Sequence, residues 1–340
     1  MVMLTASRLG SRLALGTGKT EVKDMGSYTE LGSFFKEGIL SLGPGAPSSQ
    51  YYPFDDISLK IPSIGRFTEA EFMDSGVRVE TRKYDMKESR SMYGTGSTQL
   101  LDFVTEHTKL VHDPPYLDWQ CVLTGGNTSA LDLAFRTFTE RGSYILVDEY
   151  TYPTAFETGY PLGIRYAAIR IDEEGPLPEH MDEILENWDE KTKGAKKPHI
   201  LYTVPTGQNP SGATQGLERR RNIYRIAQKH DVYILEDDPY YFIQMLPSTG
   251  SGKEQLKPSA PTSPSAFVET LVPSFLRLDT DGRVLRMDSF SKIIAPGTRT
   301  GWVTASQQIV DRFVRAHETS LQNPSGFSQI MLFKLLREGW

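Results

Sequence analysis

The sequence predicts an α/β fold in which a mostly parallel central sheet carries helices on both faces. From about residue 120 onward, short apolar segments alternate with longer segments of helical periodicity, as in chains of βαβ units. The 340 residues are 38% hydrophobic, which is enough for the core of one large domain or two smaller ones. Right-handed crossovers would bring the carboxyl ends of the strands to one edge, where ligands bind in such sheets.

The expected elements follow one another along the chain without an internal repeat. We expect strands at Val122 to Leu123, Tyr144 to Val147, Ile164 to Ile171, His199 to Val204, Val232 to Leu235 and Val284 to Met287. We expect helices beginning at Leu100, from Ser129 to Glu140, near residues 179 to 190, from Leu217 to His230 and from Ser328 to Glu338.

Composition divides the chain into a head and one large domain with an insertion. Residues 1–37 form an N-terminal head that we expect to be partly disordered, and residues 38–340 form the large domain. Residues 246–282 hold many proline, serine and glycine residues in a polar run, which predicts a surface insertion. Residues 38 to 55 are rich in glycine and proline, so we expect either a domain-entry loop or a loop that lies over a ligand.

Charge and cysteine content exclude several classes of partner. The net charge of -6 comes from scattered acids and bases without a basic block, so we expect no nucleic-acid partner. No apolar run approaches the roughly 18 residues that span a bilayer, so we expect no membrane span. The single cysteine, Cys121, allows no internal disulfide and no cysteine-based metal cluster, and we expect no metal site. We expect a cytoplasmic location, with a mitochondrial presequence as the alternative for the basic, acid-free residues 1 to 20.

Glycine-rich motifs mark two turns that precede helices. In Thr124 to Leu131, glycines bring backbone close to a ligand and the following helix offers free N–H groups, which favours a phosphate site; an ordinary turn is the alternative. The segment Tyr93 to Ser97 is interpreted as a turn and helix cap, or as part of a ligand site.

Three further motifs carry polar side chains at strand ends. Asn209, in an Asn-Pro-Ser-Gly turn, either binds a ring hydroxyl or serves only the turn. Asp237 lies between two other acids at the end of an apolar strand, where a carboxylate can keep a pyridine nitrogen protonated; a helix cap or solvated turn suits Asp238 better. Lys292 lies close after two serines and seven positions before Arg299, which suits covalent binding of an aldehyde cofactor beside its phosphate; the alternative is a surface lysine.

In this order the motifs resemble the fold type I pyridoxal-phosphate aminotransferases. The sequence is most similar to the aromatic amino acid, kynurenine and 2-aminoadipate aminotransferase group, especially its fungal members, over roughly residues 38 to 338. The specific set is Asn-Pro-Ser-Gly, Glu-Asp-Asp-Pro-Tyr-Tyr, and Asp-Ser-Phe-Ser-Lys followed by Pro-Gly-Thr-Arg-Thr-Gly-Trp. The resemblance implies the large domain of the type I fold and pyridoxal 5'-phosphate as the cofactor.

The resemblance also implies roles for individual residues. Lys292 would bind the cofactor aldehyde and move the substrate Cα proton, while Asp237 would pair with the ring nitrogen. Asn209 and Tyr240 would contact the phenolic oxygen, Tyr152 would stack on the ring, and Gly45 and Asn209 would face the substrate. The phosphate would be held by Gly126, Asn127, Thr128, Ser289, Ser291 and Arg299, and by Tyr93 from a neighbouring subunit.

The activity implied is transfer of an amino group between an amino acid and a 2-oxo acid by a homodimer, in amino acid metabolism and biosynthesis. Family members continue past Trp340 into a small C-terminal domain that clamps the substrate carboxylate, and we expect that domain to be largely missing here. The alternatives are another pyridoxal-phosphate activity, such as a carbon-sulfur lyase or a tailoring enzyme of secondary metabolism, and a non-catalytic relative that dimerises with a longer chain.

Overall fold

A seven-stranded sheet forms the centre of the computed structural model, which describes residues 53, 56–62, 68, 76–80, 96–244 and 263–339. Its strand order is β3-β11-β10-β9-β8-β4-β5. The strands are β3 (Trp119–Thr124), β4 (Tyr144–Asp148), β5 (Arg165–Ile169), β8 (Ile200–Thr203), β9 (Tyr233–Asp237), β10 (Val284–Ser289) and β11 (Gly301–Ser306).

Strand β11 alone runs against its neighbours in this sheet. It is antiparallel to both β3 and β10, whereas β10, β9, β8, β4 and β5 pair in parallel. The loop from β10 to β11 is short and contains one 3-10 turn, η4 (Pro296–Thr298), and a short connection can join only antiparallel strands. The expected mostly parallel sheet is therefore confirmed.

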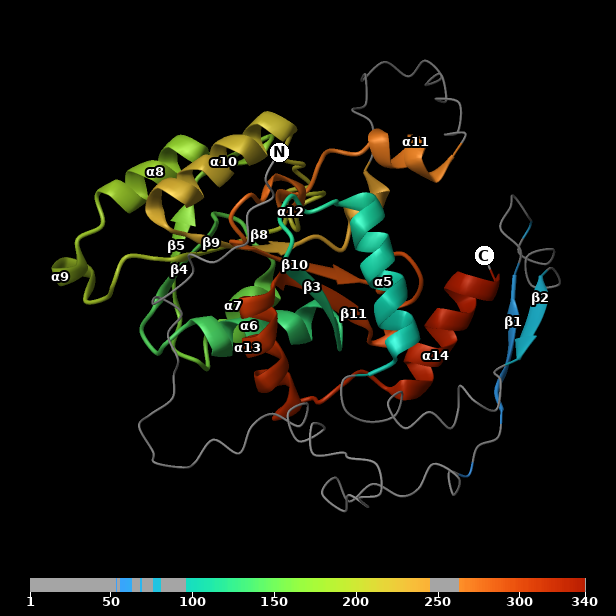
Figure 1. Cartoon of the computed structure of the whole chain (residues 1–340). Coiled ribbons are helices and arrows are strands. Elements are labelled where there is room, and N and C mark those ends of the chain that lie inside the picture. The colour runs from blue at the N-terminus through green and yellow to red at the C-terminus, as the bar shows by residue number, and fades with distance from the viewer. Residues whose placement is uncertain are drawn as a thin grey trace.

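Helices cover both faces of the sheet (Figure 1). The first face, which we call the α6 face, is covered by α6 (Asn127–Phe138), α7 (Pro153–Gly159) and α13 (Gln307–Glu318). The second, the α10 face, is covered by α5 (Thr98–Val111), α8 (Pro178–Glu186), α10 (Leu217–His230), α12 (Phe275–Leu278) and α14 (Gly326–Lys334). Shorter helical segments are α9 (Glu190–Lys193), α11 (Pro264–Glu269), the 3-10 turn η3 (Tyr241–Ile243) and the π-turn η5 (Leu335–Gly339).

Strand alternation separates the two cores. In β9, Tyr233 and Leu235 pack in the cluster of the α6 face, while Ile234 between them packs in the cluster of the α10 face. Successive side chains of a strand point to opposite faces, so a strand that is buried on both sides consists of consecutive apolar residues. The same alternation decides where the polar residues at the end of β9 point.

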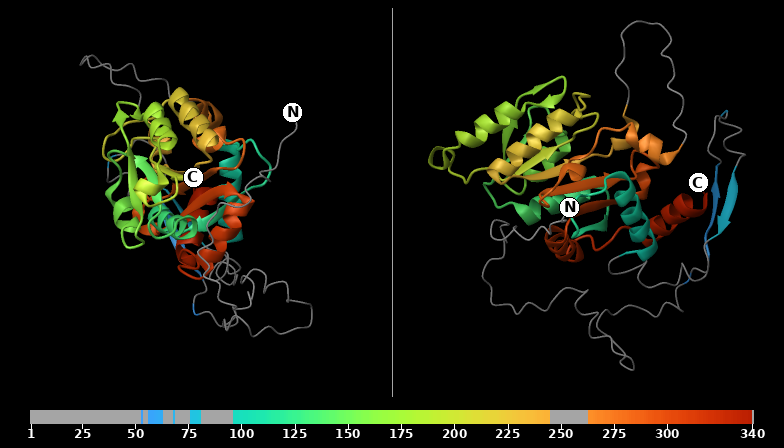
Figure 2. Two further views of the ribbon diagram at one scale, coloured as in Figure 1. Left: turned by 90° about the vertical axis from the view of Figure 1, so that its left-hand side faces the viewer. Right: turned by 45° about the horizontal axis from the view of Figure 1, so that its top comes forward.

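Two small strand pairs lie outside this sheet. Strands β1 (Ser58–Ile61) and β2 (Val77–Glu80) form an antiparallel ribbon, and β6 (Ile171–Asp172) pairs with β7 (Gly175–Pro176). Figures 1 and 2 show the ribbon of β1 and β2 apart from the seven-stranded sheet, beside the C-terminal end of α14. Within the described part of the chain, no helix is both long and apolar enough to cross a bilayer.

Most expected elements are confirmed, with local differences. The helix from Leu217 to His230 has the expected bounds, and Ser97 caps α5 through its hydroxyl, which accepts from the Leu100 N–H at 3.3 Å. The helix expected near 179 to 190 is two helices, because the first ends at Glu186 with Asn187 as its C-cap, and Asp189 caps the second. The strand expected up to residue 171 ends at 169, and β6 continues the chain in a separate pair.

The segment 246–282, which we expected to be a surface insertion, is not at the surface over its whole length. Phe275 and Leu276 are fully buried and pack on the α10 face. The Asp279 carboxylate accepts the backbone N–H groups of Gly282 and Val284, at 2.9 and 3.0 Å, and so shapes the turn into β10. The last part of this polar-looking segment therefore belongs to the core, because its few apolar residues close the α10 face beside α10.

Candidate active site

A cavity of about 240 Å³ opens at the carboxyl ends of β8, β9 and β10. It is lined by Asn127, Thr128, Leu131, Tyr152, Val204, Asn209, Asp237, Pro239, Tyr240, Ser289, Ser291, Lys292, Pro296 and Arg299. The structure thus brings together ten of the residues that the sequence assigned to a cofactor site. They come from loops far apart in the sequence, because parallel strands end at the same edge of the sheet.

Asp237 lies at the floor of this cavity and is only 6% exposed. One carboxylate oxygen accepts a hydrogen bond from Asn127 Nδ2 at 2.6 Å, and the other accepts one from the Tyr202 hydroxyl at 2.8 Å. Burial raises the pKa of Asp237, and the bonds from Asn127 and Tyr202 act in the opposite direction. The carboxylate is therefore fixed by two neutral donors.

A cradle for an anion lies at the start of α6. Gly126 precedes the helix with φ 92°, and no side chain caps the first N–H groups. A Cβ at Gly126 would lie 3.5 Å from Arg299 Nη1 and 3.8 Å from Ser289 Oγ, so the arginine and the serine stand over the helix start. Free N–H groups at a helix N-terminus, hydroxyls and a guanidinium are the donors that hold phosphates.

The serines and the arginine of the cradle are joined by hydrogen bonds. Ser289 Oγ donates to Ser291 Oγ at 2.9 Å, and Arg299 Nη2 donates to the same Ser291 oxygen at 2.8 Å. Arg299 also donates from Nε to the Pro296 carbonyl at 2.7 Å, and its backbone has φ 45° in the left-handed region. Such a conformation costs roughly 1 kcal/mol for a side chain other than glycine, and here it turns the guanidinium toward the cradle.

Lys292 follows β10 directly, at the opening of the cavity. Its Nζ lies 5.9 Å from the centre of the Tyr240 ring, and its side chain is exposed. The preceding Phe290 is buried against Trp302, with ring centres 5.1 Å apart, which anchors the start of the lysine loop. Burial raises the pKa of the Tyr240 phenol, so this hydroxyl remains a hydrogen-bond donor beside the lysine.

The loops that carry Tyr152 and Asn209 are tied to each other by Gln208. Its amide nitrogen donates to the Tyr150 carbonyl, and its oxygen accepts from the Ser211 N–H at 2.8 Å. Sequence reasoning missed Gln208, whose only signal is its place between a strand end and Asn209. It also missed Tyr202, a hydroxyl-bearing residue of β8 that pairs with Leu235, two residues before Asp237 in β9.

Asn127 and Asp238 differ from their expected roles. The Asn127 side chain binds Asp237 and the Met287 carbonyl at 3.0 Å, so only its backbone lies at the anion cradle. Asp238 is neither a cap nor part of a solvated turn: it is 1% exposed and accepts from the Thr206 hydroxyl at 3.0 Å. Strand alternation puts it on the α10 face, where Arg286 lies 3.5 Å away.

Two assigned residues, Gly45 and Tyr93, lie outside the described residues. The others fit the cofactor that the sequence resemblance implies, because a carboxylate, a lysine and an anion cradle line one cavity. Asn127 Oδ1 is buried without a hydrogen-bond partner in the described structure, which is consistent with a polar group binding beside it. Pyridoxal phosphate needs these three features: a cation or N–H cradle, an amine and an acid for the ring nitrogen.

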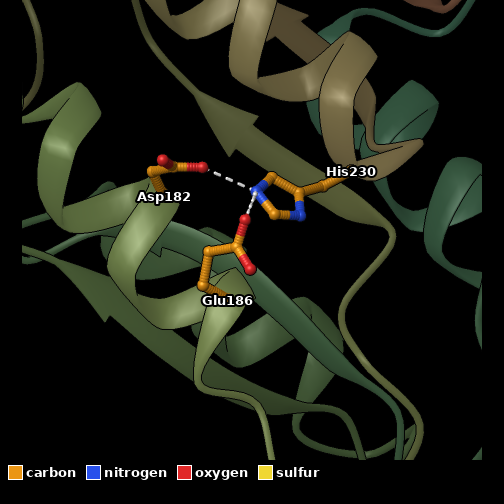
Figure 3. A group of neighbouring side chains, drawn as sticks. All are labelled: Asp182, Glu186 and His230. Carbon is orange, nitrogen blue, oxygen red and sulfur yellow. Dashed lines mark hydrogen bonds and ion pairs between the residues drawn. The ribbon is translucent and has the colours of Figure 1, made fainter.

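A second cluster of titratable side chains lies between α8 and α10. Asp182 and Glu186 approach the buried His230 (Figure 3), with the Asp182 carboxylate 2.6 Å from His230 Nε2. Side chains of these types bind metal ions. Lys229 Nζ already lies 2.9 Å from Asp182 and 2.6 Å from Glu186, so an ammonium group neutralises the carboxylates. We interpret the cluster as an ion-pair network that joins the two helices.

Comparisons with known proteins place this geometry in a family. Residues 73–338 match the model of the aminotransferase class I and II family. An aromatic amino acid aminotransferase of Schizosaccharomyces pombe is 45% identical over 310 residues, which cover 88% of this chain and 64% of that protein. An L-tyrosine:2-oxoglutarate aminotransferase of Serpula lacrymans is 38% identical over 315 residues, which cover 89% of this chain and 59% of that protein.

The crystal structure of the aminotransferase Aro8 from Candida albicans superposes with a TM-score of 0.82 at 38% identity. The match covers 91% of this chain and 66% of the Candida protein. The chain spans less than two thirds of the length of the two curated relatives, at 64% and 59%. By its sequence match over residues 73–338 and by its fold, the chain belongs to the class I and II aminotransferases.

Proposed function

We propose that the chain is the cofactor-binding part of an aminotransferase that moves an amino group between an aromatic amino acid and a 2-oxo acid such as 2-oxoglutarate. The cofactor of the family is pyridoxal 5'-phosphate. The observation that carries the proposal is the convergence of Lys292, Asp237 and the Arg299 cradle on one cavity. The substrate class is supported by the names of the relatives in Schizosaccharomyces pombe and Serpula lacrymans. Kynurenine and 2-aminoadipate are the alternative amino donors that the sequence resemblance implies.

Each residue has a task that follows from its position. Ser289, Ser291 and Arg299, with the first N–H groups of α6, would hold the phosphate. Asp237 would hold a proton on the ring nitrogen, and the bound cofactor then withdraws electrons from the substrate Cα. Lys292, whose exposed side chain lines the cavity, would bind the cofactor covalently and carry the Cα proton.

Asn209 and Tyr240 would position the cofactor from its other edge. Both line the cavity, and Tyr240 keeps a donating hydroxyl. Tyr152, the first residue before α7, lines the same cavity from a loop that Gln208 holds in place. An aromatic ring there is suited to stack on the ring of the cofactor.

The proposal is tested by titrating the purified full chain with pyridoxal phosphate and recording the visible absorbance, followed by L-tyrosine and then 2-oxoglutarate. We expect a new absorbance band that tyrosine removes and 2-oxoglutarate restores. Lys292→Ala should abolish the covalent band, while Lys229→Ala, a lysine far from the cavity, should keep it. The proposal fails if the wild-type chain develops no band, or if Lys292→Ala develops the same one.

The same experiment separates aminotransfer from the alternatives. Pyruvate and ammonia released without any 2-oxo acid would instead indicate a lyase. An intact band that no amino acid changes, with a longer chain co-purifying, would indicate a non-catalytic partner. We also propose a homodimer in the cytoplasm, supported by the sequence resemblance alone; light scattering of the purified chain and microscopy of a tagged chain would test these two points.

A further inference from the structure

We propose that Tyr202 and Asn127 are positioning residues that keep the Asp237 carboxylate charged and aimed at the cofactor ring nitrogen. This inference rests on the proposed function, because it concerns the same cavity. It goes beyond the family assignment, since neither residue was expected to act at the ring end of the site.

The geometry of the three side chains supports the inference. Tyr202 comes from β8 and Asn127 from the first turn of α6, and they donate to different oxygens of Asp237 at 2.8 and 2.6 Å. Asn127 Nδ2 is fixed in turn by the Met287 carbonyl of β10 at 3.0 Å. Two donors on two oxygens prevent rotation of the carboxylate, and each oxygen keeps a lone pair for another donor.

The bonded partners of Asp237 are neutral. Within residues 96–244 and 263–339, no lysine or arginine forms an ion pair with it, although its side chain is nearly buried. Arg286, whose charge also lowers the pKa of Asp237, lies on the α10 face and is bonded to other acids. A buried carboxylate without a bonded cation keeps its charge only if neutral donors compensate for lost water.

Tyr202 is suited to be a permanent donor. It is fully buried, with its ring centre 6.4 Å from that of Phe135. Burial, followed by the nearby Asp237 charge, raises the pKa of the Tyr202 phenol well above its usual value, so the hydroxyl keeps its proton. The hydroxyl therefore has one function in this position, which is to donate to Asp237.

A matched pair of variants tests the inference. Tyr202→Phe removes only the hydroxyl that binds Asp237, and Asn127→Ala removes the second donor from a site that is partly open to solvent. The control is Tyr224→Phe, because Tyr224 is also a buried tyrosine that donates to a buried carboxylate, that of Asp279 at 2.9 Å, but on the α10 face. Thermal unfolding of all three proteins shows whether each is folded.

Two measurements do not depend on turnover. The first is the titration of the Asp237 carboxyl in cofactor-free protein, followed by ¹³C NMR: both site variants should raise its pKa, and Tyr224→Phe should not. The second is ¹⁵N NMR of ring-labelled pyridoxal phosphate bound to each protein. We expect a less protonated ring nitrogen and about tenfold weaker cofactor binding in each site variant.

The outcomes distinguish this inference from the proposed function. If the wild-type chain does not bind pyridoxal phosphate, the proposed function fails, and the carboxyl titration alone decides the role of the two donors. If the wild type binds the cofactor but Tyr202→Phe and Asn127→Ala leave both the carboxyl pKa and the ring nitrogen unchanged, the inference is wrong. A change of the same size in Tyr224→Phe would also overturn it.

Discussion

Three consecutive acids, Glu236 to Asp238, lie at the end of β9 and directly after it, and the two faces of the sheet hold them in different ways. On the α6 face, Asp237 is bonded to an amide and a phenol, both neutral, and faces the cavity. On the α10 face, Glu236 and Asp238 lie 2.9 and 3.5 Å from the buried Arg286. Residues of nearly the same chemistry thus meet cations on one face and neutral donors on the other.

The α10 face neutralises its charges internally. Arg286 also binds Asp288 at 2.8 Å, and Glu236 accepts the backbone N–H groups of Phe275 and Leu276 at the start of α12. Arg220 adds a second guanidinium 3.9 Å from Glu236. An acid whose charge is already neutralised by an arginine attracts a ligand only weakly. The negative charge of Asp237 is not neutralised in this way, so it can interact with a positively charged group that enters the cavity. The bonded partner, and not the residue type, therefore decides whether an acid in this segment stabilises the fold or is available to a ligand.

The largest expected effect comes from removing the cation of the α10 face. Arg286→Leu would leave the acids Glu236, Asp238 and Asp288 buried without their main partner. Loss of one partner from a buried ion pair typically costs about 3 to 5 kcal/mol. We expect a loss of at least that size in the free energy of unfolding, measured by denaturant titration. A variant as stable as the wild type would show that the acids of the α10 face do not depend on Arg286 for their stability.

A buried acid without an arginine should respond to pH. Among the residues that the structure describes, Thr203 and Gln208 donate to the Asp148 carboxylate, and burial raises the pKa of Asp148 from 3.8 to about 7. The folded state therefore holds a proton that the unfolded state releases, so this group contributes stability below pH 4 that is lost as the pH rises to about 7.

Asp148→Asn removes that dependence, because the amide has no charge to bury. The variant should match the wild type near pH 4 and exceed its free energy of unfolding at pH 8 by up to about 4 kcal/mol. Denaturant titrations at several pH values measure the difference. A difference that stays constant across this range would show that Asp148 is ionised throughout.

The anion cradle should distinguish two forms of the cofactor. Arg299→Gln removes an exposed guanidinium that contacts Ser291, so the fold should be kept. We expect about 10-fold to 100-fold weaker binding of pyridoxal phosphate and little change for pyridoxal, which lacks the phosphate. Absorbance titrations with both compounds measure the two affinities. If the affinities for pyridoxal phosphate and for pyridoxal fell equally, Arg299 would not act on the phosphate.

The smallest effect is expected for the ion pairs between α8 and α10. Lys229 is about half exposed and pairs with Asp182 and Glu186 at the surface. Exposed ion pairs contribute little to stability, because water already solvates and screens their charges, so Lys229→Met should change the free energy of unfolding far less than Arg286→Leu does. Denaturant titrations of Lys229→Met and Arg286→Leu under the same conditions compare their losses in the free energy of unfolding. If Lys229→Met lost as much stability as Arg286→Leu, the exposed ion pairs between α8 and α10 would be as stabilising as the buried ones around Arg286, which contradicts the prediction.

Much of the fold could be predicted from the sequence, because its signals are local. The helix from Leu217 to His230 and the apolar strand before Asp237 are each specified by a few neighbouring residues. The polar run before β10 misled the prediction for Phe275 and Leu276, because burial there depends on contacts with α10 that composition does not record.

The site was predictable to the extent that its residues belong to motifs. Asp237 ends β9, Lys292 and Arg299 lie in the loop after β10, and the three residues line one cavity as expected. The donors of Asp237 could not be identified in the same way, since Tyr202 lies 35 residues away in the chain and its hydroxyl reaches the carboxylate only once β8 and β9 pair. Strand alternation could have separated Asp237 from Asp238, but not named Arg286 as the partner.

Lys292 should be the residue that binds the cofactor covalently, beside Asp237. The most direct test of this assignment is reductive trapping: pyridoxal phosphate is added to the full chain, borohydride reduces the bond between lysine and cofactor, and mass spectrometry locates the label. We predict a phosphopyridoxyl group on Lys292 and none on this peptide in Lys292→Ala. A label confined to other lysines, or no label at all after saturation with cofactor, would contradict the account.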